Sequence, residues 1–330
     1  MMREPIGTIL SSSCVLAVVV ALSTEAHAKA QIVTFDVPGA TSTEAVSINA
    51  GGAITGIWGD AAGAHGFLRQ RDGTITTFDV PGADPAFGTR PSSINKKDYI
   101  TGNYATLNDR GKDVPHVFIR SPDGTINTFG VPNNGRYDYP VKITTDRAVI
   151  GSYLKGRVSY GFIKPHHGKT TIFQDQQNDT VVTAANNLNA ATGWIIRTAS
   201  AFVRNPDGTF TYFAIGALGT EPRDINDEAT VVGSAGADGF VRTSDGEDTE
   251  FDAGGTQTFP YAVNNHGAIT GSFNGDPGSH GFVRDPSGSI TIFDPEGALF
   301  TQARSINGRG IIAGSYSDQQ GLGHGFIRYP

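Results

Sequence analysis

Cysteine is almost absent from the chain, whose 330 residues include one, Cys14. One cysteine can form no disulfide within the chain, and zinc sites built on several cysteine ligands are excluded as well. Charged residues are scarce too, at 17% of the chain, and 25 basic against 32 acidic residues give a net charge of −7. Because the sequence contains no basic tract, we do not expect nucleic acid as a partner.

The familiar signatures of catalysis are missing from the sequence. It has no GxSxG elbow, no HExxH motif, no phosphate-binding loop and no dinucleotide fingerprint. It also lacks the regular Asp-Xaa-Asp spacing of a calcium loop. We therefore expect no cofactor and no metal ion, and the sequence leaves open whether the protein is an enzyme.

The N-terminal segment has the features of a secretory signal peptide. Arg3 supplies a positive charge, the nine-residue apolar run CVLAVVVAL follows, and the tripeptide AHA ending at Ala28 resembles a cleavage site. The run is shorter than the roughly 18 apolar residues of a membrane span, and Cys14 opens it instead of closing it as in a lipoprotein signal. We expect residues 1–28 to be removed, and the mature chain, 29–330, to reach the periplasm or the cell exterior without a membrane anchor.

Glycine, by contrast, is abundant, with 43 residues, and it belongs to a repeated pattern. Three marks each occur seven times: the phenylalanine of HGF-like motifs, a glycine after an Asn-led turn as in NAGGAITG, and the phenylalanine of segments such as TITTFD. The first mark returns every 38 to 51 residues. Its positions are Phe67, Phe118, Phe162, Phe202, Phe240, Phe282 and Phe326. The second falls at Gly56, Gly102, Gly151, Gly193, Gly233, Gly271 and Gly314, and the third at Phe35, Phe78, Phe129, Phe173, Phe213, Phe251 and Phe293.

Each repeat predicts four short strands, which we call a to d. In the first repeat, strand a ends at residues 47–49, and strands b, c and d occupy 53–58, 65–69 and 74–80. Asp-Gly pairs between strands c and d supply the positive φ of a tight hairpin. Units of this length with four strands are typical of β-propeller blades. The sequence therefore predicts an all-β fold, a single seven-bladed β-propeller of four-stranded blades.

The two ends of the chain complete one another in this scheme. The segment QIVTFDVPGA at 31–40 has the pattern of a strand d with no repeat before it, and the last segment, HGFIRYP at 324–330, lacks a strand d. We predict that the N-terminal strand completes the last blade and closes the ring, which would remove two open sheet edges.

The repeat, summarised as SINxxGxITGxY…HGFxRxxDGTITxFDxPGA, resembles the HAF family of bacterial extracellular repeat proteins. The resemblance covers essentially the whole mature chain. It implies a repeat architecture and assigns no activity. This chain has His-Gly-Phe where the family's name has His-Ala-Phe.

The repeated histidine of HGF could be interpreted as catalytic. A reaction needs one general base at one site, however, and not the same residue in several repeats. Histidine occupies this position in four repeats, at His65, His116, His280 and His324. We interpret it as structural, with its imidazole hydrogen-bonded to neighbouring backbone, and we expect the phenylalanines to fill the space between blades. The basic residue that follows, such as Arg69, is predicted to pair with the acid after strand d, such as Asp79.

Function is expected where the repeats differ, in the d–a and b–c connections, which share one face of a propeller around the channel mouth. These connections hold cations, aromatic rings and carboxylates suited to an anionic or carbohydrate-like ligand. The candidate ligand-binding residues are Arg90, Arg136, Tyr137, Tyr139, Glu221, Arg223, Tyr261, Arg304, Trp58 and Tyr104, with Asp138 and Asp224 beside them.

The sequence supports three functions. The first is a secreted, monomeric binding propeller with its ligand at the channel mouth. The second is an enzyme on the same face, such as a polysaccharide lyase, in which a Tyr or His abstracts a proton and an arginine stabilises the neighbouring carboxylate. The third is a structural or adhesive surface protein without a small ligand.

Overall fold

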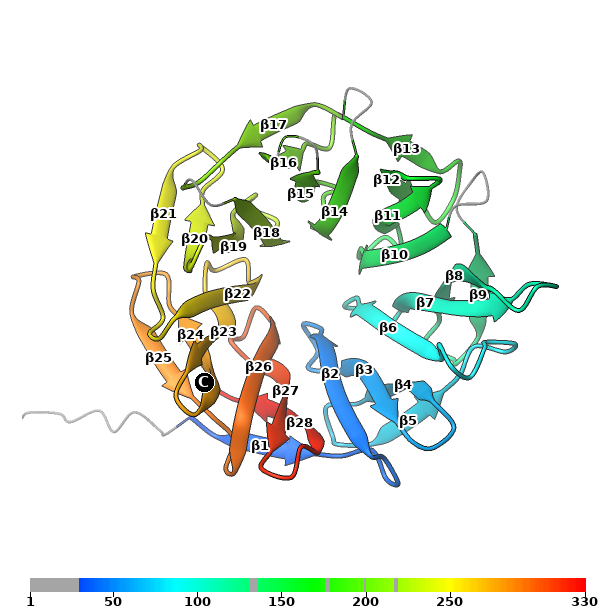
Figure 1. The fold of residues 1–330 in the computed structure, drawn as a ribbon, viewed down its shortest axis with the longest axis horizontal. Helices are drawn as coiled ribbons and strands as arrows, with labels where there is room; N and C mark the ends of the chain where they lie inside the picture. The colour runs from blue at the N-terminus through cyan, green and yellow to red at the C-terminus, as the bar shows by residue number, and fades with distance from the viewer. Residues whose placement is uncertain (1–29, 131–135, 176–178, 197, 199, 217–218) are drawn as a thin grey trace, which may run out of the picture.

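The computed structural model describes residues 30–130, 136–175, 179–196, 198, 200–216 and 219–330, with only the backbone described at 136–138. These residues form 28 β-strands and no helix, arranged in a ring around a central axis (Figure 1). No helix long and apolar enough to cross a membrane occurs in the described part of the chain. The predicted signal peptide, residues 1–28, lies outside the described residues.

Consecutive strands pair antiparallel in sets of four, and we number the sets along the chain. The first set is β2 (Ser42–Ile48), β3 (Ile54–Gly59), β4 (Ala64–Arg69) and β5 (Ile75–Phe78), and the second is β6 (Thr89–Ile94), β7 (Ile100–Leu107), β8 (Asp113–Arg120) and β9 (Ile126–Phe129). The third is β10 (Arg136–Ile143), β11 (Val149–Lys155), β12 (Val158–Lys164) and β13 (Thr171–Phe173), and the fourth is β14 (Thr180–Ala185), β15 (Ala191–Ile195), β16 (Ser200–Arg204) and β17 (Phe210–Phe213). The fifth is β18 (Thr220–Ile225), β19 (Val231–Ala235), β20 (Asp238–Arg242) and β21 (Asp248–Phe251), and the sixth is β22 (Gln257–Val263), β23 (Ile269–Gly275), β24 (Gly278–Arg284) and β25 (Ile290–Phe293). The seventh is β26 (Ala298–Ile306), β27 (Ile312–Asp318), β28 (Gly323–Arg328) and β1 (Ile32–Phe35).

The sets are separate sheets, apart from two single parallel bridges. Sets two to five are four-stranded sheets, whereas the bridges Ser279↔Phe300 and Ser42↔Gly323 join sets six, seven and one into a twelve-stranded sheet. In each set the first strand, a, lies nearest the axis and the fourth, d, lies at the rim (Figure 1). The a strands therefore form the inner wall of the ring.

The two ends of the chain meet in the seventh set. Strand β1 pairs antiparallel with β28, from Ile32↔Arg328 to Phe35↔Gly325. The expected pairing of the N-terminal strand with the C-terminal hairpin is therefore present, and it supplies the outer strand that the last repeat lacks (Figure 1).

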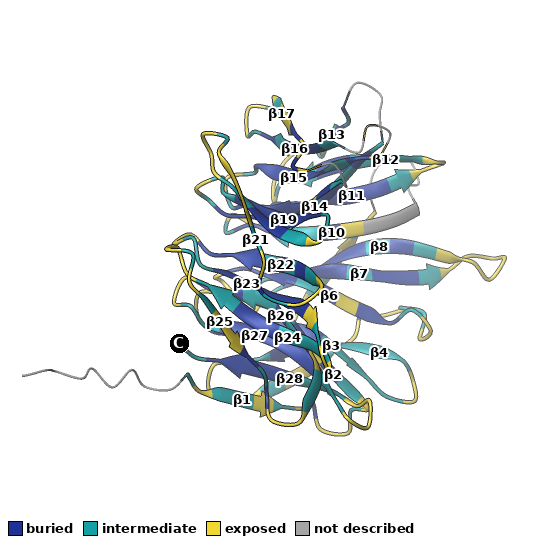
Figure 2. Cartoon of the chain, turned by 60° about the vertical axis from the view of Figure 1, so that its left-hand side comes forward, coloured by how far each residue is buried: buried dark blue, intermediate teal, exposed yellow. Residues whose placement is uncertain are grey.

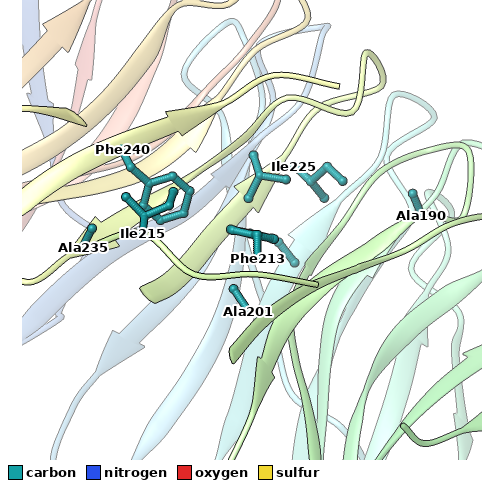
Figure 3. Close-up of a cluster of buried hydrophobic side chains, with 9 residues drawn as sticks. Ala190, Ala201, Phe213, Ile215, Ile225, Ala235 and Phe240 are labelled. Atoms are coloured by element: carbon teal, nitrogen blue, oxygen red, sulfur yellow. The ribbon is translucent and has the colours of Figure 1, made fainter. Parts of the chain in front are cut away.

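The core lies between neighbouring sets, where the repeated phenylalanines pack. All seven phenylalanines of the HGF-like motifs are 0% exposed, as predicted, and the buried residues lie mainly on the inner and middle strands of each set (Figure 2). Between sets four and five, Phe213 and Phe240 meet edge to face with ring centres 6.1 Å apart, beside Ile225 (Figure 3). Such a pair stabilises the fold by about 0.5–1.5 kcal/mol beyond the burial of its apolar area.

The predicted ion pair between Arg69 and Asp79 is wrong. Antiparallel pairing places Arg69 opposite Ile75 at the start of strand d, so that Asp79, after the end of that strand, lies near His65 instead. The guanidinium of Arg69 lies over the ring of Phe35, 4.9 Å from its centre, where the π face attracts the partly buried cation. The same contact recurs as Arg120–Phe78, Arg204–Phe173, Arg242–Phe213, Arg284–Phe251 and Arg328–Phe293.

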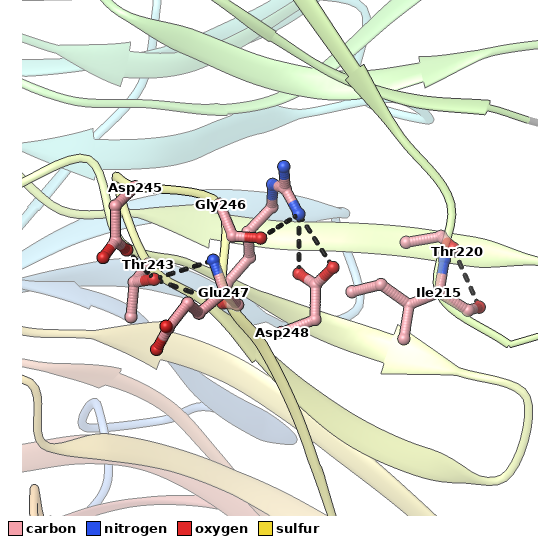
Figure 4. A network of polar contacts seen from close by, with 8 residues as sticks. Ile215, Thr220, Thr243, Asp245, Gly246, Glu247 and Asp248 are labelled. Carbon is pink, nitrogen blue, oxygen red and sulfur yellow. Dashed lines mark hydrogen bonds and ion pairs between the residues drawn. The ribbon is translucent and has the colours of Figure 1, made fainter.

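The arginine that follows the HGF-like motif does pair with an acid where that acid stands at the start of strand d. Asp248 lies opposite Arg242 in the register, and its carboxylate oxygens accept hydrogen bonds from Nη1 of Arg242 at 2.8 Å (Figure 4). Figure 4 also shows how a threonine fixes the start of strand a, since Thr220 Oγ1 accepts a hydrogen bond from the backbone N of Ile215 at 2.7 Å. The first residue of the inner strand is thereby tied to the connection that leads into it.

Every strand a carries at least one register shift against strand b, and β10 and β26 carry two; each shift inserts one extra residue into the inner wall. In β22 the shift falls between Pro260 and Ala262, and Gly271 of β23 lies opposite Pro260. A Cβ on Gly271 would lie 2.1 Å from the carbonyl oxygen of Phe259, so the bulge requires glycine on strand b. The bulged residue in three of the sets is Arg223, Tyr261 or Arg304.

Candidate functional site

A belt of asparagines closes around the axis where strand a turns into strand b. Each asparagine accepts hydrogen bonds within its own turn, as Asn49 Oδ1 does from the backbone N of Ala53 at 3.0 Å. Its Nδ2 donates to the backbone carbonyl of the equivalent residue in the next set, at 2.8 to 3.1 Å. The members of this Asn belt are Asn49, Asn95, Asn186, Asn226, Asn264 and Asn307.

The third set departs from the belt, because Thr144 replaces its asparagine. The link to the fourth set is made one residue later, where Thr145 donates from its backbone N to Asn187 Oδ1 at 3.1 Å. The same position links onward, since the backbone N of Asn187 donates to Asp227 Oδ1 and that of Asp227 to Asn265 Oδ1. Hydrogen bonds between neighbouring sets therefore run around the whole ring.

A cavity of about 520 Å³ occupies the axis, within the range of small-molecule sites. Every set contributes to its wall, from the bulged residue of strand a to the start of the a–b turn. Four cations and two carboxylates are among the lining residues, in a chain whose net charge is −7. These charged residues are Lys96, Lys142, Arg223, Arg304, Asp224 and Asp227.

The structure brings three of the ten predicted binding residues into this cavity: Arg223, Tyr261 and Arg304. Asp224 lines it as well. The cavity lies toward the a–b turns, in the half of the channel away from the d–a connections where we expected the ligand. Five other predicted binding residues are described and do not line the cavity: Arg90, Tyr139, Glu221, Trp58 and Tyr104. The side chains of Arg136, Tyr137 and Asp138 lie outside the described part of the chain.

Arg223, Tyr261 and Arg304 stand at the bulges of three successive inner strands, β18, β22 and β26, and we call them the Arg–Tyr–Arg arc. Each is supported by the residue two positions earlier on its strand. Nη2 of Arg223 donates to Glu221 Oε2 at 2.8 Å, and Nη2 of Arg304 donates to Gln302 Oε1. Tyr261 lies parallel to Phe259, with ring centres 6.5 Å apart. The supports fix the direction of all three side chains.

Each guanidinium group of the arc uses one nitrogen, Nη2, in the hydrogen bond to its support. The Nε of Arg223 and that of Arg304 are enclosed and have no hydrogen-bond partner among the described residues, so a ligand would contact the Nη atoms. An arginine fork can bind a carboxylate or phosphate through two parallel hydrogen bonds, and a tyrosine ring can stack on a flat or sugar-like group. The arc therefore has the chemistry of an acid-binding wall.

Asp224 is a titratable group in the same wall. Its Oδ2 accepts a hydrogen bond from the backbone N of Val263 in the next set at 2.9 Å, a link that serines make in other sets. Burial of the carboxylate raises its pKa to about 6, a rise that Lys142 and the backbone donors oppose and that Asp227 reinforces. Asp224 thus changes charge near neutral pH at a point that faces the cavity.

Asp227 keeps its charge under the same conditions. Burial acts to raise its pKa, but hydrogen bonds from Asn265 and Asn187, with the attraction of Lys142, outweigh burial and lower the pKa overall. Its side chain is therefore a fixed anion in the rim of the cavity. Among the described residues, no group of three or more His, Cys, Asp or Glu side chains is placed to hold a metal ion.

Trp58 and Tyr104 take part in a repeated contact with the HGF position. Trp58 stacks on His65 with ring centres 4.5 Å apart, and Tyr104, which is 6% exposed, packs on His116 at 5.2 Å. The equivalent pairs are Tyr153–Tyr160, Phe273–His280 and Tyr316–His324. The histidine bonds to side chains and not to backbone as we expected. His65, for example, contacts Asp79 through Nδ1 and Asp60 through Nε2, at 3.0 and 3.1 Å.

Sequence reasoning missed Lys96, Lys142 and Asp227. All three stand in or next to the Asn-led turn, which we used to align the repeats without assigning it a role. The available signal was the variation within that alignment: Lys142 occupies a position held by serine in three other sets, at Ser47, Ser93 and Ser305.

No family model matches the chain, and no curated protein matches it by sequence. Solved structures do resemble it. Virginiamycin B lyase from Staphylococcus aureus is 12% identical with a TM-score of 0.66, over 92% of this chain and all of that one. A streptogramin B lyase structure is 10% identical with a TM-score of 0.62, over 90% and 97%. The β-propeller domain of the Trilobed protease from Pyrococcus furiosus is 9% identical with a TM-score of 0.57, over 87% and 94%. At these identities the likeness concerns the fold alone, and it identifies the ring as a β-propeller.

Proposed function

We propose that the chain is a seven-bladed propeller that binds a small anionic ligand in its central cavity. Each set of four strands corresponds to one blade in this proposal, and β1 closes the ring as the outer strand of the seventh. Removing residues 31–38 tests the closure. The truncated protein should melt at a clearly lower temperature, because β28 would lose its partner and expose a sheet edge. An unchanged melting temperature would contradict closure.

One observation carries the binding function: the Arg–Tyr–Arg arc projects from three successive inner strands into a cavity with a surplus of cations. Arginine provides bidentate recognition of a carboxylate, and the tyrosine ring provides a surface for the apolar face of a sugar. The acidic chain as a whole gives no reason for cations to gather here, so their position favours an anionic ligand over a neutral one.

We further propose that the protein is exported, on the basis of its N-terminal segment and its resemblance to the HAF extracellular repeat proteins, and that it acts as a monomer. These features and the arc together favour a binding protein that meets carboxylated carbohydrates outside the cytoplasm. A purely structural or adhesive role would not require cations in an inner cavity.

Isothermal titration and thermal shift with galacturonate, and with galactose as the neutral analogue, test the binding function. We expect galacturonate to bind and to raise the melting temperature, since a ligand of the native state stabilises it. Arg223→Ala or Arg304→Ala should weaken binding about tenfold or more, the effect of losing a hydrogen bond to a charged group. Arg90→Ala is the matched control, because Arg90 lies outside the cavity and bonds to the carbonyl of Phe87. Equal binding of galacturonate by all three variants would show that the cavity is not the binding site.

A second candidate function, a lyase, is favoured by Asp224. A carboxylate with a pKa of about 6 beside an arginine is suited to abstract a proton next to a carboxylate that the arginine holds. The solved neighbours that are lyases share the fold with this chain, and their reaction is not carried over. Incubation with polyuronate should give an absorbance of unsaturated products if the protein is a lyase, and Asp224→Asn should abolish it. Absence of product with wild-type protein would leave the binding function.

A further inference from the structure

We infer that the ligand of the central cavity carries two acid groups, one held by the Arg–Tyr–Arg arc and the other by Lys142 on the opposite wall. This inference rests on the proposed binding function. The ligand class that fits is an acidic disaccharide with one carboxylate on each ring, a di-uronide.

The four cations of the cavity stand on four different sets, with the two lysines on neighbouring sets and the two arginines on either side of set six. Arg223 and Arg304 project from sets five and seven, whereas Lys142 belongs to β10 of set three and Lys96 to the turn after β6 of set two. In Figure 1, β10 and β6 lie across the central opening from β18 and β22. A ligand bound to the arginines therefore extends toward the lysines.

Uncharged stretches lie between the lysines and the arginines on both sides, just as the uncharged residues 261–265 of set six lie between the two arginines. Set one contributes residues 46–50, which are Val, Ser, Ile, Asn and Ala, and set four contributes residues 183–187, which are Thr, Ala, Ala, Asn and Asn. Neither stretch carries a charge that could bind an acid group. A ligand that uses both the arginines and the lysines needs a second acid group, with an uncharged middle between the two.

Lys142 is available for such a contact. Its side chain is half-buried in the cavity wall and forms no hydrogen bond or ion pair with any described side chain. Its charge interacts with the carboxylates of Asp224 and Asp227 in set five, beyond the uncharged stretch of set four. A ligand carboxylate would give this ammonium group a hydrogen-bonded partner.

A sugar backbone suits the space between the two acid groups. Tyr261 offers its ring for stacking, and the hydroxyls of Ser47 and Thr183 stand on the uncharged walls to the two sides. A volume of about 520 Å³ suits a drug-sized ligand. Neutral, hydroxyl-bearing walls between two cationic ends thus match a chain of two acidic sugars better than an apolar diacid.

The test is a titration series with three probes: digalacturonate, galacturonate and the neutral disaccharide lactose. We expect wild-type protein to bind digalacturonate about tenfold or more tightly than galacturonate, from one additional charge-assisted hydrogen bond. Lys142→Met keeps the length of the side chain and removes its charge. It should abolish the advantage of the second carboxylate, whereas the affinity for galacturonate should change by a smaller factor.

Lys97→Met is the matched control, because Lys97 is exposed in the turn beside the cavity and does not line it. Galacturonate binding without any advantage for digalacturonate would overturn the two-acid inference and leave the proposed function intact. Equal weakening of both acids by Lys142→Met would also overturn it, because Lys142 would then act through its general field. Failure of both acids to bind would instead overturn the proposed function. Lys142→Arg, which restores the charge, should regain the advantage.

Discussion

Asn307 donates a hydrogen bond from its Nδ2 to the backbone carbonyl oxygen of Asn49 at 3.1 Å, and thereby joins the last strand set of the chain to the first. The two residues are 258 positions apart in the sequence and occupy the same place in their repeats. Asn307 also closes its own turn, with Oδ1 accepting from the backbone N of Arg309 and of Ile311. One side chain therefore fixes both a local turn and the contact between two sets.

Replacing Asn307 with alanine should destabilise the protein by about 2–4 kcal/mol, because it removes three hydrogen bonds of a buried side chain and leaves their backbone partners unsatisfied. Urea denaturation measures the change. Asn127→Ala is the control, since Asn127 is exposed on the outer strand β9 and should change stability by less than about 0.5 kcal/mol. Equal effects of the two substitutions would contradict a structural role for the Asn belt.

A second prediction concerns Ala229, the last residue of the equivalent a–b turn in set five. Its φ is +59°, whereas the equivalent positions Gly52, Gly267 and Gly310 use glycine in the left-handed region. Ala229→Gly should stabilise the protein by about 0.5–1 kcal/mol, since relief of the left-handed strain exceeds the entropy cost of glycine. Differential scanning calorimetry should show a higher melting temperature.

Gly267→Ala provides the reverse experiment. The nearest atom to a Cβ there is 3.8 Å away, so the substitution introduces left-handed strain without a clash. It should destabilise the protein by about 1–2 kcal/mol. A change of the same sign in both variants would show that φ does not control this turn.

The repeat pattern was sufficient to predict the strands and their pairing. Phenylalanines such as Phe67 and Phe282 recur because each closes the same gap between neighbouring sets, and both are fully buried as predicted. The pairing of β1 with β28 could be predicted for a related reason: the fragment before the first repeat and the incomplete last repeat have complementary patterns.

The site was harder to predict, because its position depends on how the sets are packed around the axis. The sequence marks Arg90 and Arg223 as similar, since both lie near the start of a strand a. Only Arg223 sits at the bulge and turns into the cavity, whereas Arg90, two positions earlier in its repeat, is exposed. The bulge becomes visible when the register of strands a and b is known.

The pairing of β1 with β28 should depend on pH through His324. Its Nδ1 contacts the carboxylate of Asp36, next to β1, at 3.0 Å, while Asp318 lies 3.5 Å from Nε2 and Tyr316 stacks on the ring. Burial acts to lower the pKa of His324, but the two carboxylates outweigh burial and raise it overall. A raised pKa means that the stabilisation is complete below the unfolded value of about 6.5 and is lost as the pH rises through the folded value.

Asp36→Asn should therefore cost more stability at pH 6 than at pH 9. The contact is largely exposed, so the difference should stay below about 1 kcal/mol. Urea denaturation of both proteins at the two pH values measures it. Asp109→Asn, in an exposed turn, should show no such difference. A larger cost at pH 9 would reverse the assigned sign and contradict the role of protonated His324.

Ligand binding in the cavity should strengthen as the pH falls, because of Asp224. Its pKa is about 6, and at higher pH its negative charge repels an anionic ligand. Asp227 also faces the ligand, but its lowered pKa keeps it ionised from pH 5 to 8. Uronate carboxylates are ionised throughout as well. Asp224 is thus the group in this wall whose charge changes.

Titration calorimetry with galacturonate at pH 5.5 and pH 8 measures this dependence. An anion beside Asp224 raises its pKa further, so binding near neutral pH should take up a proton, and the affinity should be about tenfold greater at pH 5.5 if the pKa rises by one unit or more. Asp224→Asn removes the charge and keeps one oxygen to accept the hydrogen bond from Val263, whereas the hydrogen bond from the backbone N of Ile225 is lost. That variant should bind tightly at both pH values. Its binding enthalpy should be the same in buffers of different ionisation enthalpy, because binding takes up no proton. A pH dependence that persists in Asp224→Asn would mean that another group titrates, and Asp224 would then have no part in ligand binding.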